Sequence, residues 1–435
     1  MENHNSKNNY SKGIYIHIPF CLSKCKYCDF FSIPCDLSLF NCEQRTVLFD
    51  DYIEAVCNEI LYRCTNSKDE GKFFLDTIYI GGGTPSLLSA ENLKKIILFL
   101  KHSSFFDISD DCEITVEINP DDVSHKLLAD YLKAGVTRIS CGLQSMNEKA
   151  LSFEKRRSSV QINQQAIKLL SEWPKDLSVD FICGLPYETK KTFLDRLDYV
   201  IQNLPNLSHI SMYSLTIEEE TPLGKEISSG AIDYDYEFSD ELWICSRDFL
   251  EKNGFEQYEV SNFSKKHKQC KHNLKYWNHE DYFGIGSGAC GTIYNQNGEG
   301  IRWTNVKDIK KYMDFWLVKN NYKKNDSEQS AFLKNQNKKL PQECEIIDSK
   351  ISSFEFFMMG LRKISGISQS HYKSVFNSRL PQCFIKLCKE WEKKDLCIIS
   401  NEETYTLGKK GILFLNTFLE NLMLDFNFQQ KEYEL

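Results

Sequence analysis

The sequence lacks any stretch that approaches the roughly 18 consecutive apolar residues of a membrane-spanning helix. Residues 1–12 lack the apolar core of a secretory signal, so we expect a polar N-terminal tail on a cytoplasmic protein. Basic residues are not in excess, since 53 Lys and Arg stand against 61 Asp and Glu. A surface with a net charge of −8 repels nucleic acid unless basic residues cluster, and no such cluster is present. We therefore expect no nucleic-acid partner, whereas peripheral membrane contact stays open.

The composition is that of an ordinary globular protein, with 41% apolar and 26% charged residues. It excludes a mostly disordered chain, a collagen and a coiled coil. At roughly 150 residues per domain, 435 residues indicate two or three domains, or one large domain with an appendage. The 17 cysteines are expected to be thiols, metal ligands or core residues rather than disulfides in a reducing compartment.

Short β-rich segments alternate with amphipathic helical patterns in the first half of the chain. Ser89 is expected to cap one helix and Gly135 to end another. Such alternation predicts an α/β fold with a parallel sheet, and six units favour a partial (β/α)6 barrel over a short open sheet. The six expected strands are 13–18, 76–80, 113–118, 137–142, 177–182 and 209–216.

The expected domain organisation follows from composition and pattern. We assign 13–230 to the partial barrel and 231–318 to an extension of it that contains the motif HNLKYW. Residues 319–345, rich in Lys, Asn and Gln, are expected to be a polar connector. Residues 346–435 are expected to form a small, mainly helical C-terminal domain.

The strongest chemical signal is the cysteine triad Cys21, Cys25 and Cys28, directly after the first expected strand. Three thiolates within eight residues can hold one metal centre, and a 4Fe-4S cluster held by three cysteines keeps one iron open for a small molecule. The alternatives are a structural zinc site with His17 as fourth ligand, and three unrelated core cysteines.

A second signal is a set of polar and glycine residues near the ends of successive strands. The glycines of GGGTPS, from Gly81, follow the second strand and can let a ligand approach the backbone. Glu117, Gln144 and Asp180 lie in or after later strands. In a parallel barrel the carboxyl ends of the strands surround one mouth, where such folds place their chemistry, so these residues and the cysteines are expected to meet there.

This combination resembles the radical S-adenosylmethionine (SAM) superfamily. Its CxxxCxxC motif matches the cysteine triad, and its glycine-rich motif matches residues 81–83. The resemblance implies a partial barrel and a 4Fe-4S cluster whose open iron binds the amino and carboxylate groups of SAM.

The segments YIHIPFC, GGGTPS, VEINP, GLQS, DFICGLP, QYEVSNF and HNLKYW are similar to a branch that contains anaerobic coproporphyrinogen oxidases and heme chaperones. The resemblance implies that Arg156 pairs with the SAM carboxylate, as a forked guanidinium can. One departure is Ser158, where this branch usually has His. The other SAM-binding residues that the resemblance implies are Tyr15, Tyr27, Gly82, Gly83, Thr84, Glu117, Gln144 and Asp180.

Two features favour the heme-chaperone side of this branch. The oxidases typically carry a fourth cysteine where this chain has Phe30, and they have a longer N-terminal extension. The chaperones have CDF after the triad and an HNxxYW motif, and both are present here. The resemblance thus implies a protein that binds heme, delivers it to hemoproteins and accepts electrons from a donor. The alternative is oxygen-independent decarboxylation of coproporphyrinogen III.

The HNxxYW motif also has a chemistry of its own. A neutral imidazole, here His272, can ligate heme iron, while Tyr276 and Trp277 can pack on a porphyrin face. Cys270 is an alternative ligand. The plainer interpretation is a loop whose aromatic residues fill the edge of a core.

Overall fold

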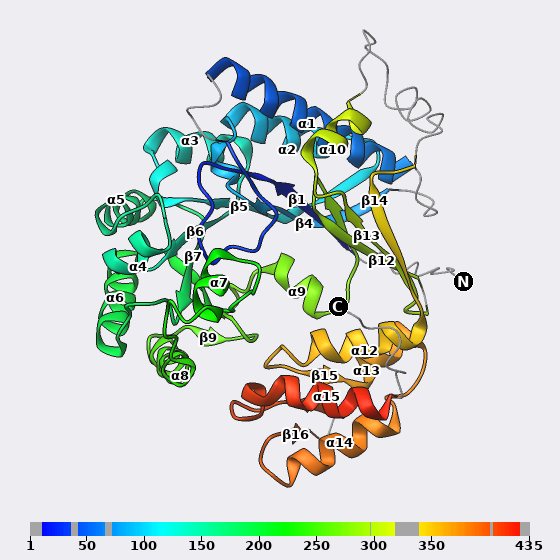
Figure 1. Ribbon diagram of the computed structural model, residues 1–435. Coiled ribbons are helices and arrows are strands. Elements are labelled where there is room, and N and C mark those ends of the chain that lie inside the picture. The colour runs from blue at the N-terminus through cyan, green and yellow to red at the C-terminus, as the bar shows by residue number, and fades with distance from the viewer. Residues whose placement is uncertain are drawn as a thin grey trace.

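A computed structural model describes residues 11–35, 42–65, 72–295, 297–317, 339–400 and 403–426. The expected tail lies outside these residues except for its last two positions, and so does most of the expected connector. Among the described residues, twelve strands form one curved sheet (Figure 1). Six of them run parallel in the order of the chain and confirm the predicted partial barrel. They are β1 (Lys12–Ile18), β4 (Phe73–Gly82), β5 (Phe106–Ile118), β6 (Arg138–Gln144), β7 (Asp176–Cys183) and β8 (Leu207–Ser214).

Both edges of this parallel sheet are extended by later parts of the chain. Strand β11 (Tyr282–Ile285) pairs parallel to β1, so the sheet continues past the first strand. Beyond it run β12 (Cys290–Tyr294), β13 (Gly300–Asn305) and β14 (Gln342–Ile347), all antiparallel. Strand β14 overlaps the end of the segment 319–345 that was expected as a connector. Strands β10 (Asn262–Ser264) and β9 (Glu256–Gln257) extend the other edge beyond β8, and the barrel is not closed.

Helices cover the outer face of the sheet in Figure 1. The local signals that start and stop them are those expected from the sequence. Ser89 accepts a hydrogen bond from the backbone of Asn92, and Gly135 ends its helix in the left-handed region at φ 95°. The main helices of this layer are α1 (Cys42–Thr65), α2 (Ala90–His102), α3 (His125–Ala134), α5 (Val160–Leu170), α6 (Lys190–Asn203) and α8 (Tyr236–Lys252). Shorter ones are α4 (Glu148–Phe153) and α10 (Ile309–Trp316). Helix α7 (Pro222–Ser228) instead lies against the cysteine loop, where the Leu223 backbone donates to the Lys26 carbonyl at 3.1 Å.

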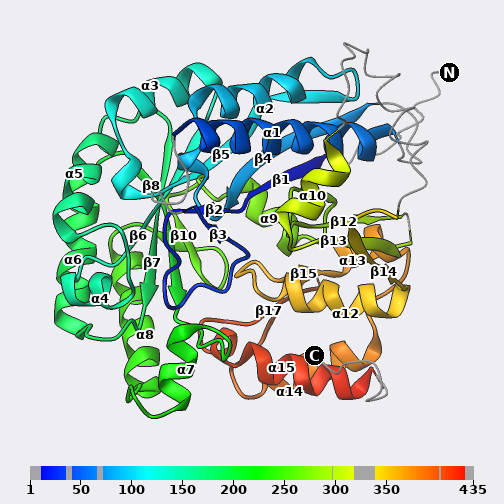
Figure 2. The ribbon, with the colours of Figure 1, turned by 45° about the horizontal axis from the view of Figure 1, so that its top comes forward.

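Two segments lie on the inner side of the sheet. The cysteine loop runs through β2 (Phe20–Cys21) and β3 (Ile33–Pro34), near the centre of Figure 2. Helix α9 (Lys271–Trp277) packs near the start of β4. The turn between β11 and β12 packs against the end of β1 and against the cysteine loop. A Cβ on Gly286 would meet the His17 carbonyl oxygen of β1 at 2.6 Å, and a Cβ on Gly288 would meet the Phe31 ring of the loop at 2.6 Å. Glu59 of α1 fixes this turn by accepting a 2.9 Å bond from the Gly286 backbone.

The C-terminal domain is mainly helical, as predicted, and has its own apolar core. It packs against the barrel near α9 (Figure 1), where His279 bonds Ser352 at 2.8 Å and Lys363 donates to Asn278 at 2.6 Å. Its elements are α12 (Ser349–Gly360), α13 (Gln369–Phe376), α14 (Gln382–Glu392), α15 (Leu415–Asp425), β15 (Ile367–Ser368), β16 (Ile398–Ile399) and β17 (Thr404–Thr406).

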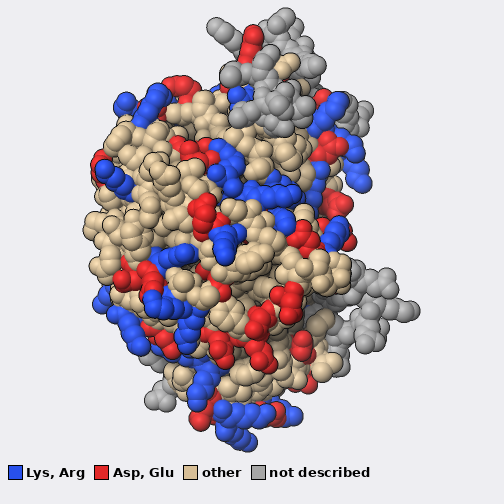
Figure 3. All heavy atoms as spheres, turned by 60° about the vertical axis from the view of Figure 1, so that its left-hand side comes forward, with Lys and Arg blue, Asp and Glu red and all other residues tan. Residues whose placement is uncertain are grey.

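The surface shows no strong separation of charge where Figure 3 displays it. Basic and acidic side chains are interspersed over this face, which carries the outer helices on the left of Figure 1. In the described part of the chain, no helix combines the length and the apolar character needed to cross a bilayer.

Candidate functional site

The cysteine triad lies at the carboxyl end of β1. Cys21 ends β2, and the backbone of Cys28 donates to the Cys25 carbonyl at 3.2 Å, which folds the loop back on itself. The pKa of Cys28 is raised to about 11, mainly by burial, and the neighbouring Cys25 and Cys21 contribute. Burial also raises the pKa of Cys21. Three thiols thus lie close together, and a bound metal centre is the kind of partner that would make them thiolates.

The zinc alternative does not fit this geometry. Both ring nitrogens of His17 are engaged, Nδ1 with the Tyr15 hydroxyl at 2.9 Å and Nε2 with the Phe31 carbonyl oxygen at 2.8 Å. Among the described residues, no three His, Cys, Asp or Glu side chains converge as the ligands of a single ion do. Each cysteine of a 4Fe-4S cluster binds a different iron, so the three thiols need not converge. The triad therefore fits a cluster better than a zinc ion.

The glycine loop after β4 locks against the cysteine loop. Gly83 donates its backbone N–H to the Ile18 carbonyl at 2.8 Å, and a Cβ on Gly83 would meet the Phe20 carbonyl oxygen at 2.7 Å. Gly82 has φ 112°, a conformation that side chains rarely adopt. Thr84 brings its hydroxyl to 3.4 Å from Cys21 Sγ. This loop can approach the cysteines only because it is made of glycine.

Two carboxylates lie on the inner face beside this loop. Glu117 accepts hydrogen bonds from the Tyr79 hydroxyl at 2.8 Å and from the Gly82 backbone at 2.9 Å. Burial raises the pKa of Glu117 to about 7. Asp180 accepts bonds from the Ser140 hydroxyl at 3.0 and 3.1 Å, and burial raises its pKa to about 6. Ligands with positive charge or hydroxyl donors would stabilise the ionised form of both groups.

Arg156 connects the cysteine loop with the ends of β5 and β6. Its guanidinium donates to the Gly142 carbonyl at 2.7 Å and to Asn119 Oδ1 at 3.4 Å, and its Nη1 lies 3.7 Å from Cys25 Sγ. Its buried Nε has no hydrogen-bond partner, so one donor of the fork is left for an anion. Gln144, at φ 62°, lies close to Gly142 on the same side. These residues fit a carboxylate-bearing ligand next to the cysteines.

Sequence reasoning missed Asn119, Ser140 and Tyr79, each of which holds a residue of this site. Asn119 lies between Arg156 and Thr84, whose hydroxyl accepts a 3.3 Å bond from Asn119 Nδ2. Ser140 holds Asp180. The sequence contained signals that could have identified the first two. Asn119 belongs to the segment VEINP, and Ser140, two residues before Gly142, points to the same inner face of its strand.

The two predicted tyrosines lie in different segments, Tyr15 on β1 and Tyr27 within the cysteine loop. Tyr15 is on β1 with its ring 6.1 Å from that of Tyr79. Tyr27 follows Cys25 in the loop and packs against a small apolar cluster that includes Ile182. Ser158, the departure from the branch pattern, is buried.

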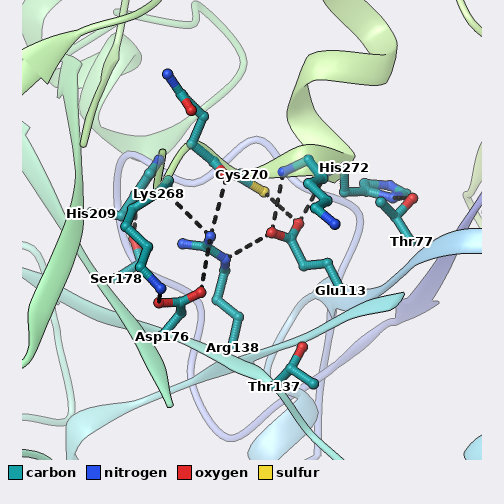
Figure 4. Close-up of polar contacts among 12 residues, drawn as sticks. Thr77, Glu113, Thr137, Arg138, Asp176, Ser178, His209, Lys268, Cys270 and His272 are labelled. Atoms are coloured by element: carbon teal, nitrogen blue, oxygen red, sulfur yellow. Dashed lines mark hydrogen bonds and ion pairs between the residues drawn. The ribbon is translucent and has the colours of Figure 1, made fainter. Parts of the chain in front are cut away.

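The HNxxYW motif forms α9 at the opposite end of the barrel from the cysteines. Figure 4 shows Glu113 at the N-terminus of this helix, accepting bonds from Cys270 Sγ at 3.3 Å and from the His272 backbone at 3.1 Å. Arg138 donates to the same carboxylate at 3.0 Å. A carboxylate is favoured at a helix N-terminus, so this ion pair anchors α9 inside the barrel.

The side chains of the motif do not share one environment. His272 is fully buried, with Nδ1 at 2.9 Å from the Thr77 hydroxyl and Nε2 at 2.8 Å from the Tyr276 hydroxyl. Trp277 instead faces the C-terminal domain, where the Arg362 guanidinium lies 4.7 Å from its ring. Neither nitrogen of His272 is free in this arrangement, and Cys270 is engaged by Glu113.

Comparisons with known proteins identify relatives of this chain. The family model of the radical SAM superfamily matches residues 15–200. The heme chaperone HemW of Haemophilus influenzae is 32% identical, over 94% of this chain and 97% of that protein. HemW of Escherichia coli is 30% identical, with the same coverage of both chains. The solved structure of coproporphyrinogen III oxidase (HemN) from Escherichia coli has a TM-score of 0.73 over 95% of this chain and 90% of that one, at 17% identity, which establishes the fold alone.

The family match contains both the cysteine triad and the glycine loop, and the HemW relatives align over nearly the whole of both chains. The chain therefore belongs to the HemW family of the radical SAM superfamily.

Proposed function

We propose that this chain is a heme chaperone that binds heme and delivers it to hemoproteins. The observation that carries the proposal is the full-length similarity to proteins named heme chaperone HemW. The alignments cover 94% of this chain and 97% of those proteins, so the C-terminal domain and α9 are included as well as the barrel. The cysteines named among the described residues are free thiols, which supports a place in the cytoplasm, a reducing compartment.

Membership of the radical SAM superfamily implies a 4Fe-4S cluster and SAM. In our proposal, Cys21, Cys25 and Cys28 hold the cluster. When bound, the cluster is the redox group of the site, and an electron donor reduces it. Arg156 binds the SAM carboxylate through its unpartnered Nε. The remaining contacts to SAM come from Tyr15, Tyr27, Gly82, Gly83, Thr84, Glu117, Gln144 and Asp180.

The alternative function is oxygen-independent coproporphyrinogen oxidation, as in the protein whose fold this chain shares. Two observations favour the chaperone. Phe30 occupies the position of the oxidases' fourth cysteine, and it is 69% exposed. The HNxxYW motif of the chaperones is present and forms α9.

The proposed heme contacts are His272, Tyr276 and Trp277. A heme ligated by His272 requires the bonds of this imidazole to Thr77 and Tyr276 to be exchanged for an iron bond. We therefore expect heme binding to involve a movement of α9. If Cys270 is the ligand instead, its bond to Glu113 has to break.

The test is a heme titration followed by transfer. Reconstituted protein, with iron content checked, is titrated with hemin and then mixed with apomyoglobin as acceptor. We expect about one heme per chain and a transfer rate that increases with acceptor concentration, because delivery proceeds through direct contact. A rate that equals spontaneous heme release and does not depend on the acceptor would contradict the chaperone proposal. His272→Ala and Cys270→Ala, compared by their Soret spectra, identify the ligand.

A further inference from the structure

A chain of contacts connects the buried imidazole of α9 with the glycine loop of the proposed SAM site. Tyr79, on β4, donates its hydroxyl to Glu117 Oε1 at 2.8 Å. The other carboxylate oxygen, Oε2, accepts the Gly82 backbone N–H at 2.9 Å. Glu117 therefore holds Gly82 in its left-handed conformation, and Tyr79 holds Glu117.

The position of Tyr79 depends on His272. The imidazole stacks on the Tyr79 ring, with centroids 5.2 Å apart and planes 28° from parallel. No other ring contact of Tyr79 in the described residues is closer, since Tyr15 stands at 6.1 Å. The stack opposes a swing of the Tyr79 side chain about χ1, and a Tyr79 in another χ1 rotamer could not donate to Glu117.

His272 suits this place because a neutral imidazole carries one donor and one acceptor. Burial lowers its pKa to about 3, which keeps it neutral. It thereby satisfies the hydroxyls of Thr77 and Tyr276 at opposite corners of the ring. Phenylalanine would stack but leave both hydroxyls without a partner, and glutamine would bond but not stack.

We propose that His272 is a positioning residue of the SAM site, acting through Tyr79 on the Glu117 carboxylate that holds Gly82. The inference rests on the SAM-binding part of the proposed function and does not depend on whether His272 also contacts heme. The HNxxYW motif lies at one end of the barrel, and through these contacts it would support SAM binding at the other end.

The chain offers a matched control for this inference in His209. It is also a buried histidine between a hydroxyl and a tyrosine, with Nδ1 at 2.7 Å from Ser178 and Nε2 at 2.8 Å from Tyr258. Its partner Tyr258 accepts the Cys270 backbone N–H at 3.3 Å, so His209 also supports the start of α9, but among the described residues no ring pair joins it to Tyr79. A loss of stability alone should therefore affect His209→Ala and His272→Ala alike.

The experiment measures SAM affinity of the reconstituted protein by equilibrium dialysis, and the change in the EPR spectrum of the reduced cluster on SAM addition. We expect His272→Ala to weaken SAM binding by about fivefold, as loss of one hydrogen bond does, while His209→Ala leaves it unchanged. In a double-mutant cycle, His272→Ala should add nothing to Tyr79→Phe, because both act through the same bond.

Three results would overturn the inference. These are equal SAM affinities for His272→Ala and His209→Ala, full additivity with Tyr79→Phe, or a normal affinity for Tyr79→Phe. If His272→Ala does not fold, Tyr276→Phe is the substitute variant. It removes the hydrogen bond to Nε2 of His272 and leaves the imidazole ring in place. This variant should also bind SAM more weakly than the wild type, and an unchanged SAM affinity would contradict the inference. Failure of the wild type to bind SAM at all would remove the proposed cofactor as well, which separates the two failures.

Discussion

Individual side chains of the site are held in protonation states that a ligand would change. The pKa of Glu117 is about 7 in the folded chain, above its ordinary value of 4.5, because the carboxyl group is buried. Between these two pH values the folded state binds more protons than the unfolded state. The stability of the ligand-free protein is therefore expected to fall as the pH rises through this window.

This carboxyl group leads to a pH dependence of ligand binding. SAM carries sulfonium and ammonium cations, which favour the ionised form of Glu117, so binding below pH 7 has to release a proton. We expect SAM affinity to decrease as the pH falls from 8 through about 7, the pKa of Glu117. Asp180, with a pKa of about 6, contributes at lower pH. Equilibrium dialysis across this range checks the prediction, and Glu117→Gln should show a weaker dependence. An identical pH profile for the variant would exclude Glu117 as the source.

The cysteines give the second prediction at this scale. Cys21→Ala, Cys25→Ala and Cys28→Ala should each abolish the 4Fe-4S cluster, because each thiol is expected to hold a different iron. Iron content and the EPR spectrum after anaerobic reconstitution are the measurements. Cys57→Ala is the control, since this buried cysteine lies on α1 and should keep full iron content. A normal cluster signal in any triad variant means that the assignment is wrong.

Among the elements, helix α9 packs so closely on β1 that the residue facing it on the strand has to be glycine. A Cβ on Gly13 of β1 would meet Lys275 Cδ at 2.8 Å, Thr77 Oγ1 at 2.9 Å and His272 Cε1 at 3.2 Å. A glycine at the start of β1 thus permits the contact on which the buried motif depends.

Gly13→Ala is therefore expected to destabilise the protein by about 1–3 kcal/mol, the usual cost of overpacking. Urea unfolding measures the change as a lower midpoint. Gly408→Ala is the comparison, because a Cβ there would meet only Ile398, at 3.3 Å and 3.8 Å. Equal midpoints for the two variants would show that α9 adjusts without strain.

The elements also show what sequence patterns can and cannot predict. The six parallel strands, the Ser89 cap and the Gly135 stop follow from local patterns, and the structure confirms them. The place of β11 beside β1 could not be predicted, because pairing between distant segments leaves no periodic signal. Nor does a motif such as HNxxYW reveal that His272 has hydroxyl partners on both sides, since Thr77 lies on another strand.

At the scale of the whole molecule, fold and chemistry are separable. The chain shares its fold with an oxidase at 17% identity, whereas its 30–32% identical relatives are named heme chaperones. The partial barrel and the cysteine motif are common to both, so they cannot distinguish the two functions. Phe30, in place of the oxidases' fourth cysteine, is a feature of this chain itself.

We expect reconstituted protein with SAM and a reductant to leave coproporphyrinogen III unconverted, because Phe30 stands where the oxidases carry a fourth cysteine. Chromatography of the porphyrins after oxidation is the measurement, with an authentic oxidase as positive control. Formation of protoporphyrinogen IX would establish the alternative function instead.

The pairing of β11 with β1 has a consequence for biosynthesis. Lys12 and Asp281 form an ion pair at 2.8 Å although 269 residues separate them. A nascent chain exposes its cysteine triad early, but β11 and the turn behind the cysteine loop emerge only after about two-thirds of translation. Until then β1 has an unpaired edge and the cysteine loop lacks the turn that packs behind it. We therefore expect cluster insertion to require a chain that extends at least through β11.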